Sequence, residues 1–189
     1  MVRKHRFQVQ KALDFGANGV QIPLANTVAD AEKAVCLSSF PPVGKRGVSP
    51  TTRAASYGLI NDMQGYMKEA NLSRLISVHI ETIEAVNSID DILRVDGIDV
   101  FFIGPGDLSA AMGLPAAEKQ VQDIMRECIK KITDAGKIAG VFIAPDAASI
   151  ERALLWGARY IITALNSCWA SAACDYFAFA NTAVDKAGR

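Results

Sequence analysis

Two acidic residues, Glu81 and Asp107, each follow an apolar segment of strand length. Residues 75–80 lead directly into Glu81, residues 100–103 precede Asp107, and the segment between them carries apolar side chains at helical spacing. A strand–helix–strand unit makes its two strands parallel and neighbouring, with about 4.8 Å between adjacent strands. We therefore expect both carboxylates at the carboxyl edge of one sheet, where α/β folds bind their ligands.

Two converging carboxylates predict a site for a hard divalent cation. Mg²⁺ and Mn²⁺ prefer oxygen ligands, and waters or substrate oxygens can occupy the positions that protein atoms leave open. The alternative interpretation is that each acid caps the helix that follows its strand, and the position of Asp107 fits this as well.

The segment 103–109, Ile-Gly-Pro-Gly-Asp-Leu-Ser, can bring backbone close to a ligand. The amides of Gly106 and Asp107 can point at a carboxylate, whereas Pro105 has no N–H to donate. The alternative is a tight turn from a strand into a helix. His79 shares a strand face with Glu81, so it either contacts substrate or metal or is a satisfied core side chain.

The composition is that of a globular protein, with 50% of the 189 residues hydrophobic and 21% charged. This length predicts one domain over residues 1–189. The 20 basic and 20 acidic residues balance, so we expect neither nucleic acid nor a membrane as a partner. No apolar stretch reaches the about 20 residues that cross a bilayer, and no apolar segment follows the basic start to make a secretory signal.

The four cysteines form no Cys-x-x-Cys pair, which argues against a zinc or disulfide framework. Cys128 falls on the apolar stripe of a predicted helix, so we expect a buried thiol there. A reducing, cytoplasmic setting fits this cysteine usage best.

Strand and helix signals alternate along the chain. Strands are predicted near residues 19–24, 75–80, 99–103, 138–143 and 159–164. Helices are predicted over 5–15, from a cap at Asn26 to about Ser38, over 60–71, 83–93, 119–135 and 146–156, and from Asn166 or Ser167 onward, with a loop over 40–58.

This alternation predicts a parallel α/β protein. A (β/α)8 barrel needs eight strands, whereas an open doubly wound sheet is complete with five, and the periodicity leaves both architectures open.

Four stretches of the chain, in their order and spacing, resemble the HpcH/HpaI aldolase family of metal-dependent class II pyruvate aldolases. They are GANGVQIP at 16–23, FPPVGKRGV at 40–48 with RAASYG at 53–58, IETIEAV at 80–86, and VDGIDVFFIGPGDLS at 95–109. The resemblance covers essentially the whole chain. It implies a (β/α)8 TIM-barrel fold of which this chain holds about five of eight parallel strands, the N-terminal part being truncated.

The resemblance also implies site residues. Glu81 and Asp107 are the implied ligands of a divalent metal, Mg²⁺, Mn²⁺ or Co²⁺. The implied substrate contacts are His79, where the family usually has Gln, together with Gly106, Asp107 and Phe142, although a core role for Phe142 fits as well.

Two parts of the family's machinery are weak or absent. Arg3 corresponds to the arginine that binds the keto oxygen of pyruvate, and Arg6 competes with it for this position. The family's catalytic His–Asp pair has no counterpart in the sequence. Arg46 can bind a substrate anion, although loop solvation or a subunit contact is the favoured interpretation.

The implied activity is that of an aldehyde-lyase that cleaves a 2-keto-3-deoxy acid, also described as a 4-hydroxy-2-oxo acid, to pyruvate and an aldehyde. The implied assembly is a homo-oligomer, a trimer or a hexamer. Because the His–Asp pair is missing, the alternative is a truncated non-catalytic homologue or fragment that retains metal binding and subunit association.

Overall fold

The computed structural model describes residues 2–188 of the chain, with side chains described from residue 7 onward. The elements are α1 (Val2–Asp14), β1 (Gly19–Ile22), α2 (Val28–Ser38), the 3₁₀ helix η1 (Arg53–Gly58), α3 (Met63–Ser73), β2 (Leu75–Ile80), α4 (Ile83–Asn87), α5 (Ile89–Ile92), β3 (Val100–Ile103), α6 (Pro105–Met112), α7 (Lys119–Asp134), β4 (Ile138–Phe142), α8 (Ala147–Trp156), β5 (Tyr160–Ile162) and α9 (Leu165–Lys186). All five predicted strands are confirmed.

The five strands form one parallel sheet in the order β1-β2-β3-β4-β5. A doubly wound sheet reverses its strand order at a switch point, whereas a barrel adds each strand on the same side of the preceding one. The sequential order therefore decides between the two architectures that periodicity left open. The chain forms a half-barrel of five strands with helices.

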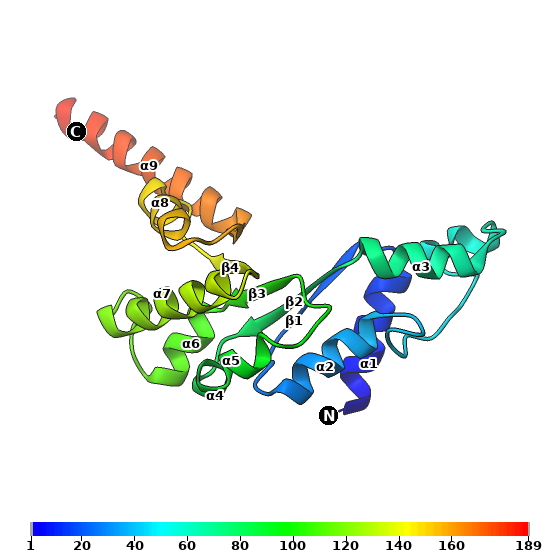
Figure 1. Cartoon of the computed structure of the whole chain (residues 1–189). Coiled ribbons are helices and arrows are strands. Elements are labelled where there is room, and N and C mark those ends of the chain that lie inside the picture. The colour runs from blue at the N-terminus through cyan, green and yellow to red at the C-terminus, as the bar shows by residue number, and fades with distance from the viewer. Residues whose placement is uncertain (1, 189) are drawn as a thin grey trace.

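The outer face of the half-barrel packs against helices. Its strand residues alternate with those of the inner face, and Ile76, Val78 and Ile80 of β2 are all fully buried. Helix α7 covers this face with the predicted apolar stripe, which is buried from Val121 to Ile132. In Figure 1, α2, α5 and α7 lie along one side of the sheet.

The inner face is covered unevenly. Phe102 of β3 is buried, and its ring meets Tyr160 edge-on with 6.2 Å between the centroids. Gly140 lies between these two residues in the register, and a Cβ there would fall 2.8 Å from the Phe102 ring. Ile138 and Phe142, at the two ends of β4, remain 45% and 37% exposed.

Several predicted boundaries are wrong in detail. The helix expected over 83–93 is two short helices, because Ser88 (φ −98°, ψ 4°) departs from helical geometry. The cap of α2 is Thr27, which forms a capping box with Asp30, while Asn26 instead accepts a hydrogen bond from Thr82. The expected loop over 40–58 contains η1, and α9 begins at Leu165.

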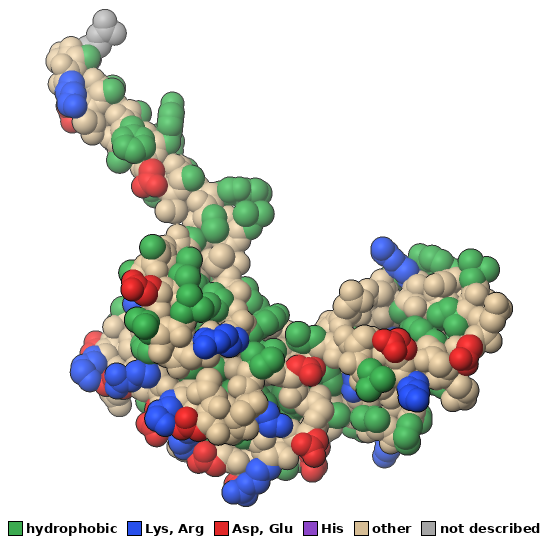
Figure 2. Space-filling view, turned by 45° about the horizontal axis from the view of Figure 1, so that its top comes forward, with side chains coloured by type: hydrophobic (Ala, Val, Ile, Leu, Met, Phe, Trp, Pro, Cys, Tyr) green, Lys and Arg blue, Asp and Glu red, His purple; other side chains and the backbone are tan. Residues whose placement is uncertain are grey.

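Helix α9 extends away from the rest of the molecule (Figure 1). None of its residues from Leu165 to Lys186 is buried, and Trp169, Phe177 and Phe179 are each more than 60% exposed. Hydrophobic side chains lie along this arm in Figure 2. Among residues 2–188, no helix has both the length and the apolar character needed to cross a membrane.

Candidate functional site

Glu81 follows the last residue of β2 and is 4% exposed. Its Oε1 accepts a hydrogen bond from the Leu24 N–H at 3.0 Å, and its Oε2 lies 2.8 Å from His79 Nδ1. The cap of α4 is Thr82, so Glu81 does not serve as a helix cap. A buried acid with two partners has a fixed orientation, as an acid that binds a ligand requires.

Gly104 provides the space in which Glu81 lies. Its position is next to Glu81 because Ile80 pairs with Ile103 in the parallel register. A Cβ at Gly104 would fall 2.8 Å from Glu81 Oε2 and 2.9 Å from its Cβ, too close for any side chain. Glycine at this position is therefore needed for the observed place of the Glu81 carboxylate.

Asp107 lies in the first turn of α6, which begins after Gly104 and has Pro105 as its first residue. The N-cap of α6 is Gly104 and makes no side-chain cap, so the cap interpretation of Asp107 is wrong. The amides of Gly106 and Asp107 have no hydrogen-bond partner within the described residues. A helix N-terminus with free amides favours a bound anion.

His79 connects β1 to the buried carboxylate. Its Nδ1 lies 2.8 Å from Glu81 Oε2 and its Nε2 lies 2.6 Å from Gln21 Nε2. The Gln21 amide nitrogen donates to Nε2, which leaves Nδ1–H to donate to Glu81. The ring also packs on Phe102, with 4.9 Å between centroids, and the side chain keeps 19% exposure.

Phe142 and Gly106 line one cavity of about 400 Å³ beside this edge of the sheet. The remaining walls come from α7 and α8, including Met125, Trp156 and the polar side chain of Arg152. Phe142 is 37% exposed at the end of β4 within the described chain.

Two predicted arginines are not part of this edge. The Arg3 side chain lies outside the described residues. Arg46 is buried, donates to Asp14 Oδ1 at 2.8 Å and packs over the Phe40 ring at 4.3 Å. The favoured interpretation of Arg46 as a solvated or subunit-contacting loop residue is therefore wrong, because an internal ion pair holds it.

The donor set at the carboxyl edge fits a hard cation. Glu81 and Asp107 supply carboxylate oxygens, and each Glu81 oxygen retains a lone pair beyond its single hydrogen bond. Across the described part of the chain, no group of three or more His, Cys, Asp or Glu side chains could hold a metal. A cation here would have two protein carboxylates and several open positions, as Mg²⁺ usually does.

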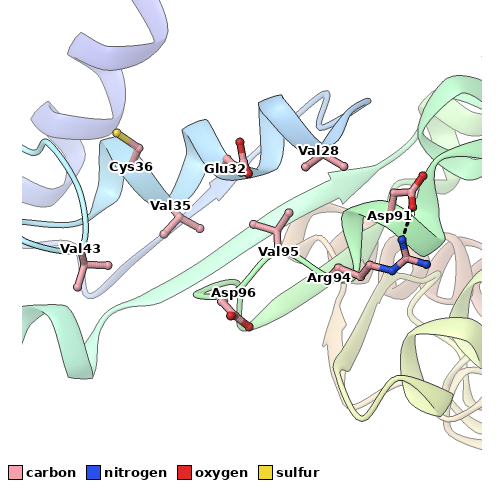
Figure 3. A pocket seen from close by; sticks show the side chains of 9 residues that line it. All are labelled: Val28, Glu32, Val35, Cys36, Val43, Asp91, Arg94, Val95 and Asp96. Atoms are coloured by element: carbon pink, nitrogen blue, oxygen red, sulfur yellow. Dashed lines mark hydrogen bonds and ion pairs between the residues drawn. The ribbon is translucent and has the colours of Figure 1, made fainter.

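A larger cavity, of about 580 Å³, lies away from this edge. Figure 3 shows it between α2 and the segment around α5, with Val28 and Val35 on one side and Val95 on the other. The Asp91–Arg94 ion pair closes one end. It brings together no predicted site residue, so cavity size does not mark the site here.

Sequence reasoning missed two contributors to the site, Leu24 and Gln21; it expected a close backbone approach in the segment of Gly104 but not the room that Gly104 leaves for Glu81. Leu24 donates its N–H to Glu81 from a backbone with φ of 58°, which follows Pro23 and has no sequence signature. Gln21 holds His79 from the neighbouring strand. The role of Gly104 could have been predicted from the strand register, since a glycine in a strand next to a functional acid indicates that the acid's side chain lies close to the backbone.

A half-barrel of sequentially ordered parallel strands, with helices on its outer face, is an α/β architecture of the barrel type. The HpcH/HpaI aldolase/citrate lyase family model matches residues 3–171, so the chain belongs to this family.

The curated relatives are aldolases by name. One is the 2-keto-3-deoxy-L-rhamnonate aldolase of Klebsiella pneumoniae, 38% identical over 169 residues, which are 88% of this chain and 62% of the relative. The chain thus spans about three-fifths of the length of this relative.

Solved structures agree on the fold. An HpcH/HpaI aldolase/citrate lyase family protein from Burkholderia cenocepacia is 31% identical with a TM-score of 0.86, covering 93% of this chain and 70% of that one. Protein CitE of Mycobacterium tuberculosis, determined with magnesium and acetoacetate, is 12% identical with a TM-score of 0.53, covering 83% of this chain and 56% of that one. At that identity the likeness shows the fold alone.

Proposed function

We propose that this chain is part of a divalent-metal-dependent aldehyde-lyase that cleaves a 2-keto-3-deoxy acid to pyruvate and an aldehyde. The observation that carries the proposal is the Glu81 carboxylate, buried and held by two hydrogen bonds at the sheet edge where α6 begins. The names of the curated relatives support the reaction class and make 2-keto-3-deoxy-L-rhamnonate the first substrate to test.

We assign Glu81 and Asp107 as the ligands of Mg²⁺, Mn²⁺ or Co²⁺. When bound, the cation supplies Lewis-acid polarisation of the 2-oxo group. Glu81 brings a carboxylate whose orientation His79 and Leu24 already fix, so little ordering is left to occur on binding.

The substrate-binding roles fall to neighbouring groups. The free amides of Gly106 and Asp107 receive the substrate carboxylate, His79 presents its exposed ring edge, and Phe142 forms an apolar wall. Arg3 is assigned to the keto oxygen from sequence alone. Cleavage of the C3–C4 bond sends the proton of the C4 hydroxyl to a base, which we place outside the described residues.

We propose that residues 1–189 form one domain that supplies five of the eight strands of a (β/α)8 barrel, corresponding to the part after the third strand. The exposed Ile138 and Phe142 of the inner face support this, because further strands would cover them.

We also propose a homo-oligomer, a trimer or hexamer, in which the apolar side chains of α9 are buried by another copy. The exposure of Trp169, Phe177 and Phe179 supports it. Light scattering during size-exclusion chromatography measures the assembly, and a monomer at micromolar concentration would contradict it.

The test of the proposed function is pyruvate release from 2-keto-3-deoxy acids with Mg²⁺, with Mn²⁺ and with EDTA. We expect metal-dependent release that falls by about 100-fold or more in Glu81→Gln. Asp123→Asn is the matched control, since Asp123 forms surface ion pairs on α7 away from this edge. The rate of pyruvate release by Asp123→Asn should equal that of the wild type.

The alternative is a non-catalytic homologue that retains metal binding and association. A folded protein that binds one metal and releases no pyruvate from any substrate would establish this alternative.

A further inference from the structure

A third cavity, of about 360 Å³ and partly polar, opens at the opposite end of the strands. It lies between the end of α1, the loop that carries Arg46, the start of η1 at Arg53, and helix α3. Asn18 and Arg74, which directly precede β1 and β2, form part of its wall. Because Arg74 precedes β2 and Glu81 follows it, six strand residues, about 20 Å, separate this cavity from the candidate active site.

Three arginines line this cavity, which we name the arginine cavity: Arg46, Arg53 and Arg74. The buried Arg46 uses Nη2 for Asp14, and its Nε has no partner. Its Nη1 makes no hydrogen bond within the described chain, and Arg46 lines the cavity. A buried guanidinium with unused donors remains incompletely satisfied.

Arg74 is held by carbonyls of α3 and by Ser39, and its Nε is also buried without a partner. Burial lowers the pKa of Arg74; the charge of Asp99 opposes this shift, and that of Arg46 adds to it. Two neighbouring guanidinium groups that repel each other would both gain from an anion between them.

The rim provides further donors. Arg53 is exposed, its stem lies about 3.8 Å from the Cβ position of Gly16, and it has no ion pair among the described residues. The Tyr66 hydroxyl and the Asn18 amide likewise have no partner within residues 7–188. Among the lining residues, the exposed Glu69 carries a carboxylate that opposes an anion at the rim. Behind the lining, Asp14 already pairs with Arg46, and the charge of Asp99 acts on Arg74.

We propose that the arginine cavity is a binding site for a small oxyanion, a carboxylate or a phosphate group, separate from the carboxyl-edge site. Guanidinium forks match the planar or tetrahedral oxygens of such groups and bind them in bidentate fashion. The volume suits a small metabolite rather than a large cofactor. This inference does not depend on the proposed lyase activity, because none of its residues belongs to the carboxyl edge.

The experiment is calorimetric titration of the full chain with inorganic phosphate and, separately, with acetate, at constant ionic strength and with EDTA present. We expect one anion per chain with a dissociation constant of about 1 mM or lower. Saturation by phosphate alone identifies a phosphate site, and saturation by acetate identifies a carboxylate site. Saturation by neither anion would overturn the proposal.

Two variants should move the affinity in opposite directions. Arg53→Gln, at an exposed position that leaves the fold intact, should weaken binding about 10-fold, and Glu69→Gln should tighten it about threefold. Arg126→Gln, an exposed arginine on α7, is the matched control and should leave the affinity unchanged. Equal weakening by Arg53→Gln and Arg126→Gln, or weakening by Glu69→Gln, would contradict a specific site.

A third variant separates the two sites. Glu81→Gln should leave anion binding at the wild-type value, whatever its effect on pyruvate release. Anion binding lost in Glu81→Gln would place the anion at the carboxyl edge and overturn the arginine cavity as its site.

Discussion

The two faces of the sheet differ in how far the described chain covers them. On the outer face, Ile76, Val78 and Phe101 are fully buried by helices that lie close to these strands in sequence. On the inner face, Ile138 and Phe142 stay exposed. The outer face is thus completed by local strand–helix units, whereas the described chain leaves the inner face partly open, and the candidate site lies where the inner face reaches the carboxyl edge.

The largest contrast is expected between two phenylalanines. Phe101→Ala removes a fully buried ring from the outer face and should lower the free energy of unfolding by about 3–5 kcal/mol. Phe142→Ala removes a partly exposed ring from the inner face and should cost about 1 kcal/mol or less. Urea denaturation measures both, and equal losses would mean that the inner face is also covered in solution.

The buried thiol of Cys128, in the outer core, should make the stability of the fold depend on pH. Burial raises the pKa of this thiol to about 11 from its ordinary 9.0, so the folded state holds the proton more tightly than the unfolded state. Stability should therefore fall as the pH rises from about 9 to about 11, by up to about 2–3 kcal/mol from this group. In Cys128→Ala this part of the slope should be absent; an identical slope would show that the thiol is not buried.

Gly140 tests the inner face. In Gly140→Ala the new methyl would meet Phe102, Val100 and Tyr160 at 2.8–3.0 Å, and the crowding should cost about 1–3 kcal/mol. Gly106→Ala is the matched substitution, because nothing lies within 4 Å and the residue is helical. Gly106→Ala should raise the free energy of unfolding by about 0.5 kcal/mol. A Gly140→Ala protein as stable as the wild type would mean that the inner side chains move apart freely.

The smallest effect is expected at the cap of α8. Hydrogen bonds from the Ser149 amide and hydroxyl hold the pKa of Asp146 below its ordinary 3.8. A depressed carboxyl pKa stabilises the fold above 3.8, and this contribution is lost as the pH falls through the folded value. Asp146→Ala should therefore lower Tm at pH 7 and approach the wild-type Tm in strong acid. A Tm difference independent of pH would contradict the charged cap.

The predictable part of the structure is the part set by local pattern. The apolar stripe of α7 and the five strands follow from periodicity, and so does the parallel pairing of β2 with β3, which sets Ile80 beside Ile103. Boundaries set by single side chains were missed, because Thr27 competes with Asn26 as a cap and Ser88 interrupts a helical pattern.

The less predictable part depends on contacts between distant segments. The pairing of Arg46 with Asp14 spans 32 residues, and the hydrogen bond from Leu24 to Glu81 spans 57. Neither leaves a periodic signal. The choice between a barrel and a doubly wound sheet likewise required the order of the strands in the sheet. The periodicity of apolar residues predicts helices and strands but not that order.

The most direct test of the candidate site is Mn²⁺ binding followed by electron paramagnetic resonance, in which bound Mn²⁺ loses the signal of the free ion. We expect one Mn²⁺ per chain in the wild type and in Asp123→Asn. Glu81→Gln and Asp107→Asn should each weaken binding by about 10-fold or more. Wild-type Mn²⁺ affinity in Glu81→Gln would contradict the account, because the metal would then be held away from the buried carboxylate at the end of β2.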